Sequence, residues 1–124
     1  MESIKVVVVG EAGVGKTCLI ISHTTAKFPS PVDCSEAEII YSENIMVGGR
    51  SVTLSIWDTN TEEEEDAEFD RLRHLHYQHT DVVLLCYSLD DRSSLEKVPS
   101  RWLPEVSAVV LHCYRLCAVL LLTL

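Results

Sequence analysis

The chain has 124 residues, of which 47% are hydrophobic, and it carries a formal net charge of −9. This length suits one domain with a single hydrophobic core, and the hydrophobic content argues against an intrinsically disordered chain. The negative charge argues against nonspecific binding to nucleic acid or to an anionic membrane, because both ligands carry the same sign. The five cysteines are scattered and no pair has CxxC spacing, which favours buried thiols in a reducing compartment.

The N-terminal half is predicted to contain a strand, a helix and a hairpin. Lys5–Val9 is a continuous β-branched run, typical of a strand buried on both faces of a parallel sheet. Lys16–Lys27 has apolar side chains at helical spacing and is followed by two prolines that stop a helix. Two strand-like runs, Ile39–Val47 and Ser51–Trp57, flank a Gly-Gly pair, which predicts a hairpin with a two-residue turn.

The C-terminal half continues the alternation of helices and strands. A short helical stretch around Leu72–Tyr77 precedes Asp81–Ser88, which reads as a second buried strand. Ser93–Val109 has a helical pattern with two prolines inside it, so we expect a short helix, a kink and a second helix. The apolar run Leu116–Leu122 is predicted to form a last strand. This order predicts an α/β fold whose mostly parallel sheet binds ligands at the carboxyl ends of its strands.

Residues 10–17 read GEAGVGKT and match the phosphate-loop pattern G-x-x-x-x-G-K-[ST], between a predicted strand and a predicted helix. Glycines let backbone N–H groups turn inward around a phosphate, and the N-terminus of the helix adds positive potential. Lys16 is expected to neutralise the β- and γ-phosphate oxygens, and the Thr17 hydroxyl to bind Mg²⁺. The candidate nucleotide-binding residues here are Gly10, Glu11, Ala12, Gly13, Val14, Gly15, Lys16, Thr17 and Cys18.

Further stretches carry a more specific resemblance. GEAGVGKTCLI, WDT, DRLRHLHYQHTDVVLLCYSLD and SSLEKVPSRWLPEV together resemble the Rho branch of the Ras-like small GTPases, from about Ile4 to about Val106. The resemblance implies a P-loop NTPase-like three-layer fold with one antiparallel hairpin in its sheet. It also implies a GTP/GDP switch with Mg²⁺, slow hydrolysis that a partner's arginine accelerates, and Rho-type regulators and effectors acting on the actin cytoskeleton.

The resemblance assigns roles to five residues. Lys16 and Thr17 match the family's catalytic phosphate-loop residues. Phe28 falls where the family stacks an aromatic ring on guanine, although a core contact is an equal alternative. Asp58 ends a strand, as does the family's aspartate that reaches Mg²⁺ through water, and a simple turn cap is the alternative. Ser35 stands where the family has a threonine that binds Mg²⁺, and a solvated loop serine is the alternative there.

Departures from the family predict slow or absent GTP hydrolysis. Where the family reads D-T-A-G-Q-E, this chain has Asn60–Glu62 after the Asp-Thr pair, and no glutamine follows in the loop to position the attacking water. Ala12 replaces a glycine, and its methyl group is expected to crowd that side chain and the partner's arginine. Seven acids crowd residues 62–70, either as a solvated loop or as a dock for a basic partner.

The C-terminal part of the chain departs most from the sequence pattern of the family. The family's guanine-reading N-K-x-D and S-A-K motifs are absent, so we expect 1–106 to be a partial Rho-like domain without the family's final strand and helix. Residues 107–124 are expected to form an apolar tail that substitutes for the last strand. Arg115 lies near the middle of this tail, which opposes a transmembrane span. No C-a-a-X box and no signal peptide are found, so a cytoplasmic monomer without a prenyl anchor is expected.

The sequence therefore predicts a GTP/GDP-binding signalling switch with impaired turnover. The alternative is a noncatalytic interaction fragment that competes for Rho partners without stable nucleotide binding. A third reading, a metal site at the H-x-H-x-x-H run of residues 74–79, is disfavoured because residues two apart do not share a helical face.

Overall fold

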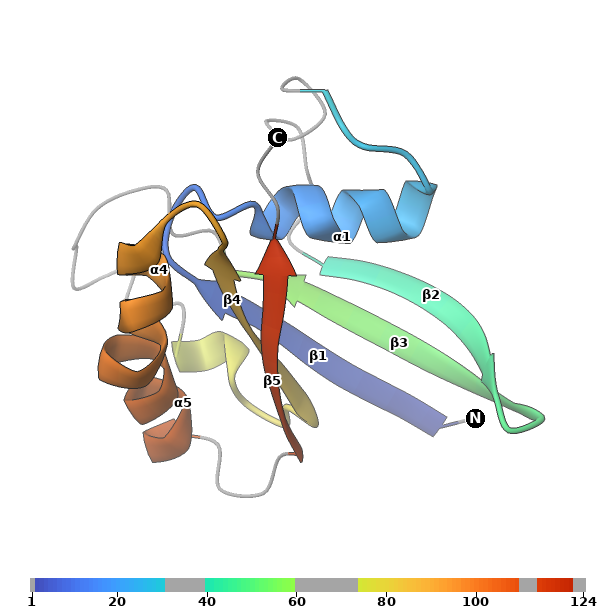
Figure 1. Ribbon diagram of the computed structural model, residues 1–124. Helices are drawn as coiled ribbons and strands as arrows, with labels where there is room; N and C mark the ends of the chain where they lie inside the picture. The colour runs from blue at the N-terminus through green and yellow to red at the C-terminus, as the bar shows by residue number, and fades with distance from the viewer. Residues whose placement is uncertain (1, 31–39, 60–73, 110–113, 122–124) are drawn as a thin grey trace.

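The computed structural model describes residues 2–30, 40–59, 74–109 and 114–121 of the chain. The strands of this part are β1 (Glu2–Gly10), β2 (Ile40–Val47), β3 (Arg50–Asp58), β4 (Val82–Ser88) and β5 (Tyr114–Leu121). The helices are α1 (Lys16–Thr25), α4 (Arg92–Lys97), the π-helix η1 (Val98–Trp102) and α5 (Leu103–Val109). The strands form one sheet in the order β2-β3-β1-β4-β5 (Figure 1).

The sheet is mostly parallel, as predicted. β1 pairs in parallel with both β3 and β4, and β4 pairs in parallel with β5. β2 and β3 pair antiparallel as a hairpin. Gly48 and Gly49 make the turn with φ angles of 55° and 79°, a left-handed conformation that glycine adopts without steric cost. The predicted fold class, a P-loop NTPase-like α/β sheet with one antiparallel hairpin, is therefore confirmed.

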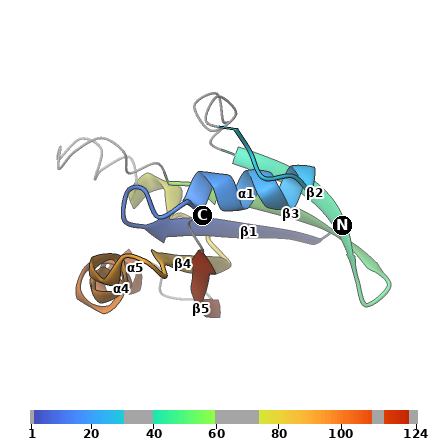
Figure 2. The same ribbon diagram turned by 45° about the horizontal axis from the view of Figure 1, so that its top comes forward.

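The described elements form three layers, with α1 on one face of the sheet and α4 and α5 on the other (Figure 2). Side chains alternate along β1, so successive valines serve different faces. Val7 and Val9 pack in a cluster with Trp102 and other residues beneath η1 and α5. Val8 packs in a second cluster beneath α1 that includes Ile20. This explains why a continuous apolar run was needed in β1, the central strand.

The predicted kink between two helices is a π-helix. Asp91 caps α4 by accepting a hydrogen bond from a backbone N–H of its first turn. Pro99 and Pro104 have no backbone N–H to donate, and between them the chain forms a wider turn in which the Leu103 N–H donates to the Val98 carbonyl. The prolines indicated an interruption, and the structure shows its type.

Two predicted boundaries are shifted. The helix expected to reach Lys27 ends at Thr25, because Ala26 has a left-handed φ of 59° that ends the α-helical geometry. The last strand, expected over Leu116–Leu122, spans Tyr114–Leu121. Within the described ranges, no helix is long and apolar enough to cross a membrane.

Cys86 lies in the middle of the sheet and is fully buried. Burial raises the pKa of its thiol to about 12, and the Asp58 carboxylate adds to the rise while the Lys16 ammonium opposes it. The thiolate is the reactive species, and at a pH about four units below that pKa roughly one thiol in ten thousand is ionised.

We therefore expect Cys86 to resist alkylation by iodoacetamide at pH 8 in the folded protein. Mass spectrometry of the labelled peptides would follow the modification. The half-buried Cys18 serves as an internal comparison, and labelling in denaturant gives the full yield for both thiols. Equal labelling of Cys86 before and after denaturation would contradict this expectation.

Candidate functional site

The phosphate-loop residues connect the end of β1 to the start of α1, at the carboxyl edge of the sheet (Figure 1). Gly10 lies so close to β4 that a Cβ atom at this position would be 2.4 Å from the carbonyl oxygen of Cys86. Gly13 and Gly15 have φ angles of 79° and 102°, which favour glycine. Val14 is buried in the cluster beneath α1 and anchors the loop to the core. The loop thus has a defined position on the sheet.

Lys16 closes this loop. Its Nζ atom donates to the carbonyl oxygens of Gly10 and Glu11, both at 2.9 Å. The residue is only 6% exposed, so its positive charge lies in an enclosed space rather than in bulk solvent. A buried cation interacts with an anion more strongly than an exposed one, because water screens it less. The position suits an ammonium group that binds phosphate oxygens.

The first turn of α1 adds positive potential at the same place. Gly15 is the N-cap residue, no side chain caps the helix, and its first turn contains no acidic residue. The unpaired backbone N–H groups of a helix N-terminus attract anions. The predicted combination of a glycine loop, a lysine and a helix N-terminus is therefore assembled in space.

Thr17 and Asp58 meet beside the phosphate loop. The Thr17 hydroxyl donates to Oδ2 of Asp58 over 2.5 Å, and Asp58 is 5% exposed. Asp58 pairs in register with Val8 of β1, and the next residue, Thr59, donates its hydroxyl to the Val8 carbonyl over 2.5 Å. These contacts fix the end of β3 against β1.

A hydroxyl and a carboxylate at one point are hard oxygen donors of the kind that Mg²⁺ binds. Mg²⁺ usually takes one or two protein ligands and completes its shell with waters and substrate phosphates. Thr17 and Asp58 fit that requirement, so they are the described residues that would hold the ion. When bound, Mg²⁺ would neutralise phosphate charge at this edge of the sheet.

The other predicted site residues have different positions. Ala12 is exposed on the loop, and Cys18 is half-buried in α1. Phe28 is 69% exposed, so the alternative of a core contact is wrong, while its stacking on guanine stays a prediction. Ser35 lies outside the described residues, as do 60–73 with the residues that replace the family's glutamine and with the acidic run.

Two residues of η1 that the sequence reading did not assign contact the phosphate loop. Oε1 of Glu11 accepts hydrogen bonds from Nη1 of Arg101 at 3.2 Å and from Nε1 of Trp102 at 3.0 Å. About ninety positions separate the partners, so no local pattern could have paired them. The Arg-Trp dipeptide is part of the SSLEKVPSRWLPEV stretch that carries the family resemblance, and nothing else in the sequence pointed to a role for it at the site.

The three histidines of the H-x-H-x-x-H run do not converge. Nε2 of His74 lies 3.3 Å from Oε1 of Glu105, whereas the ring of His76 packs against Trp57 with 5.4 Å between centroids. Burial lowers the pKa of His76, and the nearby Lys5 ammonium lowers it further. No three side chains of the kinds that bind metals gather anywhere in the described ranges.

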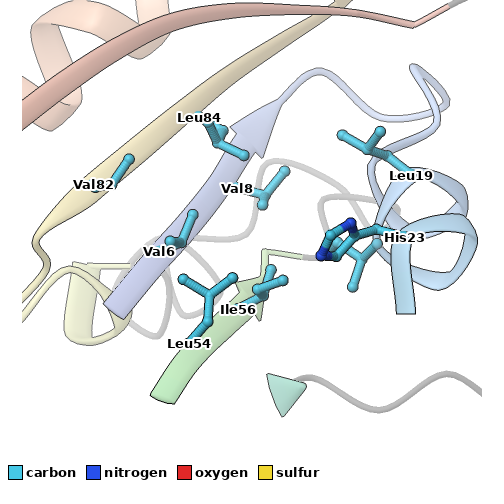
Figure 3. A pocket seen from close by; sticks show the side chains of 9 residues that line it. Val6, Val8, Leu19, His23, Leu54, Ile56, Val82 and Leu84 are labelled. Carbon is cyan, nitrogen blue, oxygen red and sulfur yellow. The ribbon is translucent and has the colours of Figure 1, made fainter. Parts of the chain in front are cut away.

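A separate cavity of about 290 Å³ lies beneath α1. Its walls are apolar side chains of α1, β1, β3 and β4, such as Leu19, Val6 and Leu54 (Figure 3). His23 is the one polar side chain among the residues that line it, and its Nε2 lies 2.6 Å from Oε1 of Glu43. No residue of the phosphate loop lines this cavity, and an apolar wall does not suit a nucleotide's phosphates.

Comparison with known families agrees with the geometry. The model of the Ras family matches residues 5–122, which is nearly the whole chain. The match includes the phosphate loop, the Thr17–Asp58 pair and the η1 residues that contact Glu11.

Proposed function

Because this chain belongs to the Ras family of small GTPases, we propose that it binds GTP and GDP with Mg²⁺ as a switch of the Rho type. The observation that carries the proposal is the enclosed Lys16 ammonium, which lies in a glycine loop beside the Thr17–Asp58 pair. One site thus offers a cation, a helix N-terminus and two oxygen donors for a metal. A nucleotide diphosphate with its metal needs each of them.

The proposed roles follow the chemistry of each group. The backbone of Gly13 and Gly15, the Lys16 ammonium and the first turn of α1 would hold the phosphates. Thr17 and Asp58 would hold Mg²⁺, with Ser35 as a further proposed ligand. Phe28, exposed beyond the end of α1, is proposed to stack on the base.

The Rho assignment is a finer proposal and depends on the stretches DRLRHLHYQHTDV and KVPSRWLPEV. With it we propose Rho-type regulators and effectors as partners, an effect on the actin cytoskeleton, and a cytoplasmic location. We also propose that 1–106 is a partial domain and that 107–124 substitutes for its last strand. The parallel pairing of β5 with β4 supports that substitution.

The test is the nucleotide that accompanies the protein when it is purified with Mg²⁺. Chromatography and mass spectrometry of the nucleotide released on denaturation would give its identity and its molar ratio to protein. Guanine nucleotide at near-unit stoichiometry is the expected result. A mixture of adenine and guanine nucleotides would support phosphate holding without base selection, and absence of nucleotide would contradict the proposal.

We expect GTP hydrolysis by this chain to be slow or absent. Ala12 stands in the phosphate loop where the family has glycine, and the loop after Thr59 offers no glutamine to position water. Single-turnover assays with GTP-loaded protein and a Rho-class activating protein would follow phosphate release. We expect no acceleration by the partner. Stimulated phosphate release would show that turnover does not need these two features.

A second function is favoured by the exposed surface of the hairpin. Met46 and Val47, next to its turn, are 69% and 53% exposed. Exposed apolar side chains beside a hairpin turn suit contact with another protein. The chain would then be a noncatalytic interaction fragment that competes for Rho partners, and it would carry no nucleotide in the test above.

A further inference from the structure

Glu11 introduces a negative charge into a loop proposed to bind phosphate. A carboxylate close to phosphate repels it, and the same carboxylate attracts the ammonium that should bind the phosphate. In the structure, both tendencies are countered by donors from outside the loop. Arg101 and Trp102 both donate to Oε1 of Glu11, at 3.2 Å and 3.0 Å. We call Glu11, Arg101 and Trp102 the Glu11 clasp.

The clasp is anchored in the hydrophobic core through Trp102. Trp102 is 0% exposed and packs with Val9 and Val106 in the larger core cluster. The Arg101 guanidinium carbon lies 4.4 Å from the centroid of the Trp102 ring, which stacks the cation on the indole. The π-helical turn of η1 carries both donors. The core therefore sets the position of Trp102, and Arg101 is stacked on that ring.

The Lys16 ammonium and the Glu11 carboxylate form hydrogen bonds with different groups. The Lys16 ammonium donates a hydrogen bond to the main-chain carbonyl of Glu11. It therefore already contacts the residue that carries the carboxylate. If the two donors from η1 were lost, the carboxylate would become available to pair with Lys16. That pairing would compete with a bound phosphate for the cation.

We propose that Arg101 and Trp102 are positioning residues for the nucleotide, which hold the Glu11 carboxylate away from Lys16 so that the ammonium serves the phosphates. This inference rests on the proposed nucleotide binding and adds a way to control it. Retention of nucleotide then depends on η1, on the face of the sheet opposite α1. A change that shifts η1 would release the carboxylate into the phosphate loop and speed nucleotide release.

The test compares release rates of a fluorescent GDP analogue from the full chain. Arg101→Gln removes the guanidinium charge and shortens the side chain, and Trp102→Phe removes the indole N–H; each is expected to speed release about tenfold, equivalent to ~1.4 kcal/mol. Adding Glu11→Gln to either variant removes the competing carboxylate. The double variants are expected to return to within about twofold of the unsubstituted chain. A purely structural contact would show no such rescue.

Arg92→Gln is the matched control, because Arg92 forms an exposed pair with Glu96 in the neighbouring helix α4. Its release rate should equal that of the unsubstituted chain. Arg101 is 40% exposed at its side chain, so Arg101→Gln keeps the proposal testable if Trp102→Phe fails to fold.

The outcomes separate this inference from the proposed function. Nucleotide retention by the unsubstituted chain, with unchanged release from Arg101→Gln, would overturn the inference and leave the function standing. Fast release that Glu11→Gln does not reverse would also overturn it. Absence of nucleotide from the unsubstituted chain would overturn the function and, with it, the inference.

Discussion

Replacing Lys16 with alanine is expected to abolish nucleotide retention, with a loss of affinity of at least about a hundredfold. The ammonium now closes the phosphate loop through the carbonyls of Gly10 and Glu11. Each hydrogen bond to a charged group contributes about 1.5–3 kcal/mol, and two such bonds to phosphate oxygens account for a loss of this size. Titration of the variant with a fluorescent GDP analogue and Mg²⁺ would measure it.

Lys97→Ala is the control for the change of charge. Lys97 is exposed at the end of α4, and its substitution removes one positive charge without altering the loop. The affinity of Lys97→Ala for the GDP analogue should match that of the unsubstituted chain. Equal retention by Lys16→Ala would mean that the loop does not hold the nucleotide through this cation.

Gly10→Ala is expected to destabilise the whole fold, at a cost of about 3 kcal/mol or more. The added Cβ would lie 2.4 Å from the Cys86 carbonyl oxygen, a backbone atom of β4 that no rotamer change can move away. Overpacking of a core usually costs about 1–3 kcal/mol, and here β1 and β4 must separate at the carboxyl end of β1, the central strand. Such a cost is a large fraction of the ~5–15 kcal/mol by which domains are stable. Urea unfolding would show it as a lower midpoint.

Gly48→Ala is the matched comparison. Nothing lies within 4 Å of a Cβ at this turn position, so the cost is limited to its left-handed φ of 55°. That conformation costs an alanine roughly 1–2 kcal/mol. A midpoint for Gly10→Ala as high as that for Gly48→Ala would show that β1 and β4 can adjust to the extra atom.

The parts of the fold predicted well are those in which neighbours in sequence decide the structure. The β-branched run of Lys5–Val9 has few alternatives to a buried strand, and the Gly48–Gly49 pair strongly favours a two-residue turn. The phosphate loop was found for the same reason, since its glycines, Lys16 and the start of α1 are contiguous. The two prolines signalled an interrupted helix without specifying a π-helix.

The contacts that complete the site join distant residues and escaped the sequence reading. Thr17 and Asp58 are 41 positions apart and meet because β1 and β3 are adjacent parallel strands. Family resemblance suggested a shared metal role for them, but only the sheet order brings them to 2.5 Å. The contact between Glu11 and Trp102 spans 91 positions and depends on how η1 packs against the sheet. Such pairings follow from tertiary packing, which a single sequence does not reveal.

For Phe28 the sequence left two roles open, and its exposure in the structure decides against one of them. The family resemblance assigned it a contact with guanine, and a core contact was an equal alternative. The structure exposes 69% of it, which leaves the ring accessible to a base. Exposure depends on where α1 ends, and the left-handed Ala26 ends that helix earlier than the sequence pattern predicted.

Calorimetric titration of nucleotide-free protein with GDP, once with Mg²⁺ and once with a chelator, tests most directly whether Lys16, Thr17 and Asp58 form one site for a nucleotide with its metal. We expect one molecule of GDP per chain and an affinity that falls at least about tenfold on chelation, because Thr17 and Asp58 would hold the ion that neutralises phosphate charge. Binding of equal strength with and without the metal would contradict the role of that pair. Absence of binding in both titrations would contradict the site as a whole.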